Sequence, residues 1–211
     1  MICVSISQSG DIGKALAQGA RLLELRLDLL KSDPTSLYSW IPKGIRTVAT
    51  CRPGPFDEKK RLALLKEAMD LGATYVDVEL ESGAGELREL IGYARSRGTE
   101  VIVSHHDFDK TPSTEELEAL VGQCYDKGGD VAKVATRVNT RDDLIRLFSL
   151  YRGPGRKVIV GMGALGRMVR VAAPYLGAEF TFASLGGGTQ TAPGQLGMDE
   201  LTKIYQIIDS Q

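Results

Sequence analysis

The sequence has few of the residues that mark several specialised classes of protein. Its three cysteines, Cys3, Cys51 and Cys124, are far apart and odd in number, so they form neither a CxxC pair nor a disulfide framework. The 26 Lys and Arg residues nearly balance the 27 Asp and Glu residues, which gives no electrostatic case for nucleic acid or an acidic membrane. No stretch is apolar enough to span a bilayer, and no basic, apolar leader precedes the first predicted strand. We therefore expect a soluble, cytoplasmic protein with neither nucleic acid nor a membrane as partner.

The chain also lacks the marks of a divided or dinucleotide-binding protein. No linker, charge run or low-complexity tract interrupts the 211 residues. No GxGxxG motif follows the first predicted strand, which counts against a dinucleotide site. The composition, with 43% hydrophobic and 25% charged residues, is that of an ordinary globular protein. We predict a single domain, residues 1–211, that buries a sizeable core.

What the sequence does contain is a regular alternation of strand-like and helix-like segments. Strands are predicted at residues 2–7, 22–29, 46–52, 75–80, 100–104, around Lys133, 157–161 and 179–183. Helical periodicity lies between them, as in the helix that Ser113 and Glu116 begin with a capping box. This alternation indicates parallel strands joined by helical crossovers. Eight such units fit a closed (β/α)8 TIM barrel better than an open doubly wound sheet.

Charged residues alternate with leucines in the second predicted strand. The leucines at 23, 25, 27 and 29 are expected to face the helices, which directs Glu24, Arg26 and Asp28 into the barrel. Asp77 and Glu79 follow the same pattern in the fourth strand. Charges inside a barrel must pair, meet water at the rim or bind a ligand. For Asp28 and Asp77, a structural layer of ion pairs explains the pattern as well as function does.

Lys133 lies in a predicted buried strand with small apolar neighbours. A desolvated lysine has a lowered pKa, and as a neutral amine it can attack a carbonyl group to form a Schiff base. An edge-strand lysine that faces solvent would explain this strand taken alone. However, Arg52, Glu79 and His106 also lie at or near the carboxyl ends of predicted strands, where barrel enzymes have their active sites. His106 has the intrinsic pKa of a general acid or base, and the adjacent His105 is expected to make only a local hydrogen bond.

Several segments together resemble the type I 3-dehydroquinate dehydratase family. They are Glu24-Leu25-Arg26-Leu27-Asp28, Thr50-Cys51-Arg52, Asp77-Val78-Glu79, Ser104-His105-His106-Asp107-Phe108, Asp130-Val131-Ala132-Lys133-Val134-Ala135, Gly161-Met162-Gly163 with Gly166 and Arg170, and Thr191-Ala192-Pro193-Gly194-Gln195. They occur in the family's order over almost the whole chain, which makes the resemblance specific although each motif alone is weak.

The resemblance implies a dimeric (β/α)8 barrel that dehydrates 3-dehydroquinate to 3-dehydroshikimate, the third step of the shikimate pathway, with no metal and no cofactor. Lys133 matches the family's Schiff-base lysine and His106 its general base. The family's substrate-binding positions match Ser5, Glu24, Arg26, Arg52, Arg170, Thr191 and Gln195. Because a planar guanidinium suits a carboxylate, Arg170 is our choice for the group that binds the substrate's carboxylate.

Two departures and two alternative functions stay open at this point. The residue before Ala-Pro-Gly-Gln, often serine in the family, is Thr191, which keeps the hydroxyl group. Many bacterial members carry a glutamate shortly after Arg52, and here Asp57, Glu58 or Glu79 is the candidate to orient His106. The Gly186–Gly188 run fits a lid better than a phosphate cradle. The alternatives are a class I aldolase on the same fold and a barrel that only binds a small carboxylate.

Overall fold

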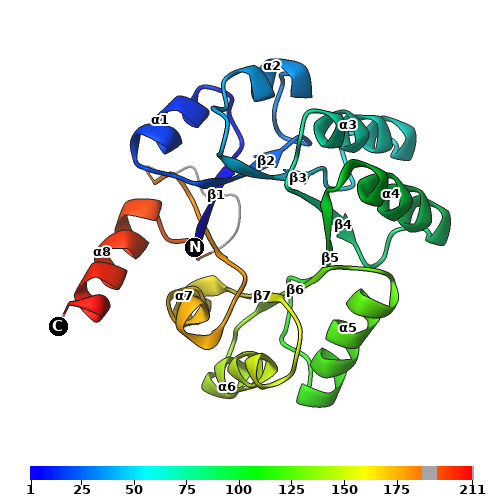
Figure 1. Ribbon diagram of the computed structural model, residues 1–211. Coiled ribbons are helices and arrows are strands. Elements are labelled where there is room, and N and C mark those ends of the chain that lie inside the picture. The colour runs from blue at the N-terminus through cyan, green and yellow to red at the C-terminus, as the bar shows by residue number, and fades with distance from the viewer. Residues whose placement is uncertain (187–193, 211) are drawn as a thin grey trace.

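Eight parallel strands surround one axis in the computed structural model, which describes residues 1–186 and 194–210 (Figure 1). The strands are β1 (Ile2–Ile6), β2 (Leu22–Arg26), β3 (Arg46–Thr50), β4 (Tyr75–Glu79), β5 (Glu100–Asp107), β6 (Val131–Arg137), β7 (Lys157–Met162) and β8 (Thr181–Ala183). Their order in the sheet, β7-β6-β5-β4-β3-β2-β1-β8, is that of a barrel in which each strand lies beside its sequence neighbour. The predicted (β/α)8 barrel is therefore confirmed.

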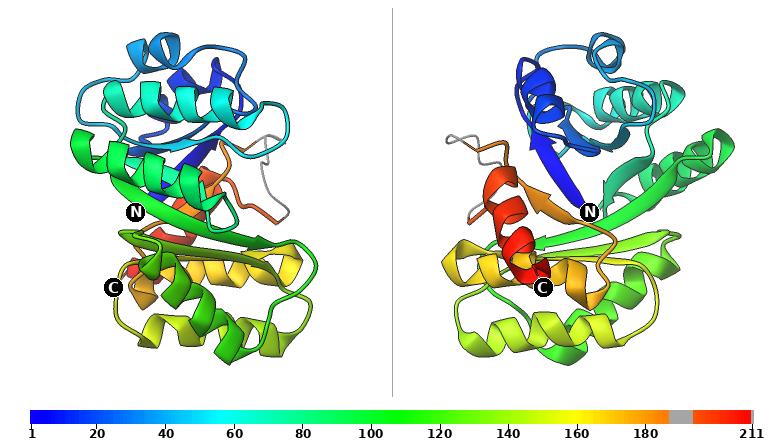
Figure 2. Two further views of the ribbon diagram at one scale, coloured as in Figure 1. Left: turned by 90° about the vertical axis from the view of Figure 1, so that its right-hand side faces the viewer. Right: turned by 60° about the vertical axis from the view of Figure 1, so that its left-hand side comes forward.

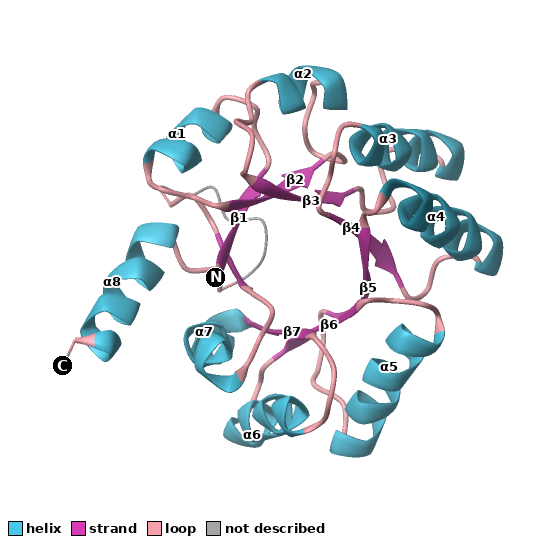
Figure 3. Ribbon diagram, viewed as in Figure 1, coloured by secondary structure: helices cyan, strands magenta, loops and turns pink. Residues whose placement is uncertain are grey.

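Helices form the outer ring of the barrel (Figure 3). They are α1 (Asp11–Ala17), α2 (Pro34–Ser39), α3 (Glu58–Asp70), α4 (Ala84–Arg97), α5 (Thr114–Asp126), α6 (Arg141–Ser149), α7 (Gly163–Ala172) and α8 (Met198–Asp209). The predicted capping box of Ser113 and Glu116 is present at the start of α5. In both views of Figure 2 the last helix, α8, lies beside α7. None of the helices in the described ranges is long and apolar enough to cross a membrane.

The barrel is nearly closed rather than continuously hydrogen-bonded. β8 pairs with β1, but no strand ladder joins β7 to β8 in the described part of the chain. At this seam the Glu179 amide donates to the Lys157 carbonyl over 2.9 Å. Arg156, just before β7, also donates to the Glu179 carboxylate through Nε at 2.9 Å and Nη2 at 2.8 Å. An ion pair therefore joins the amino ends of the two strands where the ladder is missing.

Inward-facing side chains change from apolar to polar along the strands. One layer of inward positions in β2 to β6 consists of buried apolar or aromatic residues: Leu22, Val48, Tyr75, Ile102 and Val131. Two residues further on, the same strands present Glu24, Thr50, Asp77, Ser104 and Lys133, all of them buried. Because side chains alternate between the two faces of a strand, this second layer also faces the barrel interior. The barrel thus has a packed apolar layer, followed toward the carboxyl end by a polar one.

The two largest differences from the predicted strand boundaries, three residues each, both lie near the polar end, and the other strands agree to within two residues. β2 ends at Arg26 rather than at residue 29, because the chain turns at Leu27, whose amide donates to the Thr50 carbonyl over 2.8 Å. β5 continues to Asp107 rather than ending at residue 104, because its last residues pair with β6. The longer β5 carries His106 as a strand residue opposite Ala135.

Candidate active site

A pocket of about 150 Å³ lies at the polar end of the barrel. It brings together eight of the nine predicted site residues: Ser5, Glu24, Arg26, Arg52, His106, Lys133, Arg170 and Gln195. The ninth, Thr191, lies outside the described residues. The eight come from β1, β2, β5, β6, α7 and the segments after β3 and β8, so they meet only because the barrel closes.

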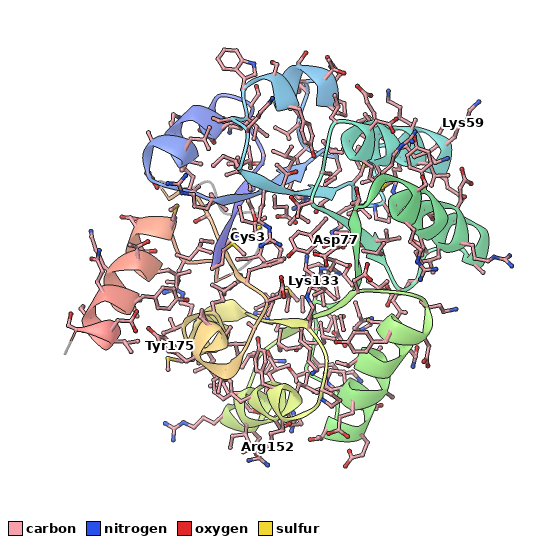
Figure 4. The ribbon with its side chains drawn as sticks, in the orientation of Figure 1. Cys3, Lys59, Asp77, Lys133, Arg152 and Tyr175 are labelled. Carbon is pink, nitrogen blue, oxygen red and sulfur yellow. The ribbon has the colours of Figure 1, made fainter. Side chains whose placement is uncertain are left out.

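Lys133 lies inside the barrel and not on its outer surface. Figure 4 shows it within the ring of strands beside Asp77, whereas Lys59 and Arg152 project outward. Its side chain is 5% exposed, and Nζ donates to Asp77 Oδ2 over 2.6 Å. Nζ also lies 4.4 Å from the centre of the Phe182 ring, a distance at which an aromatic face attracts a cation. The explanation of Lys133 as a solvent-facing edge lysine is therefore excluded.

Arg52 links Lys133's partner to the imidazole. Its Nη2 lies 3.1 Å from Asp77 Oδ2 and 3.2 Å from His106 Nε2, and its Nη1 lies 3.1 Å from Glu79 Oε1. Since a guanidinium only donates, His106 Nε2 accepts, and the ring proton of the neutral imidazole is on Nδ1. Burial, together with the positive charges of Arg52 and Lys133, lowers the pKa of His106 to about 2, so the imidazole is neutral near pH 7.

No carboxylate of the described residues orients His106 by a hydrogen bond. Of the three candidates from the sequence, Asp57 instead caps α3 by accepting from the Lys60 amide, Glu58 is exposed in the first turn of α3, and Glu79 accepts from Arg52. The described residues also provide no partner for the buried Nδ1 of His106, and the ring stacks on Phe108 at a centroid distance of 6.2 Å. The orienting contacts in this chain are thus Arg52 and Phe108. His105 pairs with Glu81 and does not line the pocket.

Arg170 carries a buried positive charge with unused donors. The residue is 1% exposed, and its Nη1 donates to the Phe182 carbonyl over 3.2 Å. Its Nε and Nη2 have no hydrogen-bond partner among the described residues. Burial lowers the pKa of Arg170 to about 10, against the opposing effect of Glu24, so the guanidinium keeps its charge at neutral pH. Nε and Nη2 are the two atoms that bind a carboxylate side-on, and this pair is free to do so.

Two glycines allow Arg170 to reach the pocket. A Cβ on Gly166 in α7 would lie 2.4 Å from the carbonyl carbon of Gly161 in β7, so the helix packs directly on the strand. This close approach places the fourth residue further along α7, Arg170, against the carbonyl end of β8. The Gly161–Gly166 spacing noted in the sequence is thus explained by packing, and its consequence is the position of the guanidinium.

A further part of the pocket wall is a chain of hydrogen bonds around Glu24. Its Oε2 accepts from Ser5 Oγ over 2.6 Å and its Oε1 from Thr50 Oγ1 over 3.0 Å. Gln195 Nε2 in turn donates to Ser5 Oγ over 3.3 Å. Leu196 brings Gln195 here, because its carbonyl accepts from the Ser184 amide over 2.9 Å at the end of β8. This wall offers hydroxyl, amide and carboxylate groups, which suit a ligand with several hydroxyl groups.

The apolar lining was not predicted from the sequence. Phe108, Ala135, Val160, Met162 and Phe182 complete the pocket. Phe108 follows β5, and the other four lie at inward positions of β6, β7 and β8, which the alternation of side chains along those strands indicates. The predicted lid at Gly186–Gly188 lies almost wholly outside the described residues, so it stays a prediction.

An arrangement of this kind, a polar pocket at the carboxyl ends of eight parallel strands, is typical of (β/α)8-barrel enzymes. The family model described as Type I 3-dehydroquinase matches residues 2–211. The chain is 32% identical to the 3-dehydroquinate dehydratase of Methanocaldococcus jannaschii, over 99% of both chains, and 35% identical to that of Methanococcus vannielii, over 99% of this chain and 100% of the relative. The crystal structure of the 3-dehydroquinate dehydratase from Aquifex aeolicus matches with a TM-score of 0.86 and 26% identity over 100% of both chains. The chain belongs to the type I 3-dehydroquinase family.

Proposed function

We propose that the protein is a hydro-lyase that dehydrates 3-dehydroquinate to 3-dehydroshikimate through an imine on Lys133, as the third step of the shikimate pathway. The relatives that match over their whole length are named 3-dehydroquinate dehydratase. The observation that carries the proposal is that one pocket holds a buried amine, a neutral imidazole and a guanidinium with two free donors. Each of these groups suits one chemical feature of the substrate: the amine its ketone, the imidazole its acidic proton and the guanidinium its carboxylate.

Arg170 binds the carboxylate in this proposal. The substrate's two carboxylate oxygens accept from Nε and Nη2, which no described residue uses. Glu24, Ser5 and Gln195 then receive the hydroxyl groups. With the ligand held at these groups, its ketone meets the amine of Lys133, which lines the same pocket. Such fixed geometry contributes much of the rate, since the reacting groups no longer have to find each other.

Lys133 supplies the electron sink. Its Nζ, once deprotonated, adds to the ketone carbon, and the carbonyl oxygen leaves as water after it receives two protons, which yields a protonated imine. The positive nitrogen acidifies the neighbouring C–H bond. When that proton is removed, its electron pair forms an enamine, and the enamine then expels the hydroxyl group on the next carbon. Hydrolysis of the conjugated imine releases the product and restores the amine.

His106 moves the protons. The neutral imidazole has a lone pair with which it takes the proton next to the imine. A base with a strongly lowered pKa becomes a strong acid once it is protonated, and this suits the next step, in which the departing hydroxyl group must leave as water. Arg52 holds Nε2 in the free protein, so the ring exchanges this contact for the substrate when the pocket fills.

The direct test is an absorbance assay for the conjugated enone that dehydration of 3-dehydroquinate creates. We expect the purified protein to produce this absorbance, and Lys133→Met, which keeps the length of the side chain, to lack it. An aldolase would instead cleave a carbon–carbon bond of a sugar phosphate, and a binding protein would give neither product. Homodimerisation and a cytoplasmic location are further parts of this proposal, which gel filtration and cell fractionation test.

A further inference from the structure

One carboxylate holds the reactive groups without lining the pocket. The side chain of Asp77 is 0% exposed, and the pocket wall does not include it. Its Oδ2 accepts from Lys133 Nζ over 2.6 Å and from Arg52 Nη2 over 3.1 Å, and its Oδ1 accepts from Ser104 Oγ over 2.6 Å. Lys133 is on β6, Arg52 follows β3 and Ser104 is on β5, so Asp77, on β4, joins groups from three other strands.

We infer that Asp77 is a positioning residue of the proposed reaction, which holds the amine of Lys133 in the orientation that captures a carbonyl group and then stays beside the nitrogen as the counter-ion of the protonated imine. The inference rests on the proposed function and extends it to a residue outside the pocket wall.

The geometry of the nitrogen explains why one carboxylate serves both states. An ammonium group has three N–H bonds, and a protonated imine has one, while the positive charge stays on the nitrogen in both. Asp77 Oδ2, at 2.6 Å, is the acceptor to which the remaining N–H points. The carbon that becomes bonded to Nζ then lies on the side away from Asp77, which is the side of the pocket. The contact therefore fixes the direction of attack as well as the charge.

The shared oxygen also couples the amine to the imidazole. Arg52 Nη2 contacts both Asp77 Oδ2 and His106 Nε2, so the carboxylate places the guanidinium that holds the ring. Burial alone would raise the pKa of Asp77, but Arg52 and Lys133 hold it well below its usual range. Asp77 is thus ionised throughout the pH range of an assay. The other charged or titratable groups that interact with Asp77, Arg52 or Lys133 come from β1, β2, β4 and β5. They are Cys3, Glu24, Arg26, Glu79 and His106.

The test is Asp77→Asn, which keeps the shape of the side chain and removes its charge. We expect kcat to fall about 100-fold, the effect of misplacing reacting groups by roughly 1 Å, while KM changes little because Asp77 does not touch the ligand. Loss of the carboxylate also leaves the amine without the charged acceptor that orients it. The rate of borohydride trapping should therefore fall together with kcat, by about 100-fold. A purely structural role would leave the trapping rate of the folded variant unchanged.

Asp143→Asn is the matched control. Asp143 is 4% exposed, against 3% for Asp77, but it caps α6 outside the pocket. Its variant should keep the wild-type kcat and the wild-type trapping rate even if it melts earlier. If Asp77→Asn does not fold, Ser104→Ala decides the matter, because it frees Oδ1 and leaves every charge in place. A severalfold lower trapping rate in Ser104→Ala supports the inference, and a wild-type rate contradicts it.

The outcomes separate this inference from the proposed function. If the wild-type protein forms no enone, the proposed function fails whatever the variants do. If the wild type forms it and Asp77→Asn matches the wild type in kcat and in the rate of trapping, Asp77 is only structural and the function stands.

Discussion

Arg170→Met should make the protein more stable and much less active, because the buried guanidinium contributes to ligand binding and does not stabilise the fold. In the structure this charge has one hydrogen bond, to the Phe182 carbonyl, and two donors without a partner among the described residues. A methionine of similar length removes an uncompensated charge from a site that is 1% exposed. Even buried charges that are paired can be replaced by well-packed apolar side chains with effects that run from neutral to a stabilisation of about 1–4 kcal/mol. Allowing for the lost hydrogen bond, we expect a gain of about 1 kcal/mol, or roughly 2–4 °C in Tm for a chain of this size.

The loss of activity follows from the same two donors. Each hydrogen bond to a charged group contributes about 1.5–3 kcal/mol, so two of them contribute about 3–6 kcal/mol. At 1.4 kcal/mol per tenfold, kcat/KM should fall roughly 10²- to 10⁴-fold. Arg170→Lys keeps the charge but not the side-on geometry, and should be intermediate in activity with no gain in stability.

Enone formation measures the activity, and thermal unfolding followed by circular dichroism measures the stability. A variant that melts below the wild type and retains its kcat/KM would assign Arg170 to the fold and refute the reasoning. Unfolding has to be measured without ligand, since a bound carboxylate would stabilise the wild type alone.

Three further expectations follow from the geometry. His106→Gln should still form the imine but make enone about 10²- to 10⁴-fold more slowly, so that mass spectrometry after borohydride finds more adduct per turnover; enone at the wild-type rate would remove His106 from the mechanism. Because burial and Arg52 lower the pKa of His106 from 6.5 to about 2, the unfolded chain binds a proton in this window that the folded chain does not. The free energy of unfolding should then fall by up to ~1.4 kcal/mol per unit as the pH drops below 6.5, and urea titrations of His106→Gln that show the same slope would contradict this. Gly166→Ala should cost about 1–3 kcal/mol and lower kcat/KM, since its Cβ would meet Gly161, whereas Gly122→Ala, with open space around it, should not; equal effects of the two would disprove the packing argument.

The sequence predicted the barrel and most of the site because both depend on patterns local to each strand. The alternation in β2 correctly directed Glu24 and Arg26 inward, since leucines on one face and charges on the other leave no other arrangement. The same pattern gave a wrong prediction at the end of the strand, because Leu29 continues the alternation but lies beyond β2 and is 46% exposed. It belongs to the turn in which Arg26 binds Asp28, and alternation cannot distinguish a turn of this kind from one more pair of strand residues.

What the sequence could not provide is the network that crosses the barrel. From the sequence, Asp77 was as consistent with a structural ion pair as with function. Its three donors are distant in the chain: Arg52 lies 25 residues before it, Ser104 lies 27 residues after it and Lys133 lies 56 residues after it. By analogy with the family, the sequence suggests a carboxylate as the partner that orients His106. The structure provides Arg52 and Phe108 instead, and only the folded barrel brings the segments after β3 and β5, which carry them, to the ring.

The central claim is that Lys133 is the amine that captures the substrate, and covalent trapping tests it most directly. The barrel contains a natural control, Lys157, which is 3% exposed, against 4% for Lys133, and whose pKa is lowered by burial. Lys157 lies at the amino end of the barrel, where its Nζ donates to the carbonyls of Gly153 and Gly155. Treatment with 3-dehydroquinate and borohydride, followed by peptide mass spectrometry, should place the reduced adduct on Lys133 and leave Lys157 unmodified. An adduct on Lys157 or on another lysine, or enone formation with no trapped adduct at all, would contradict the account.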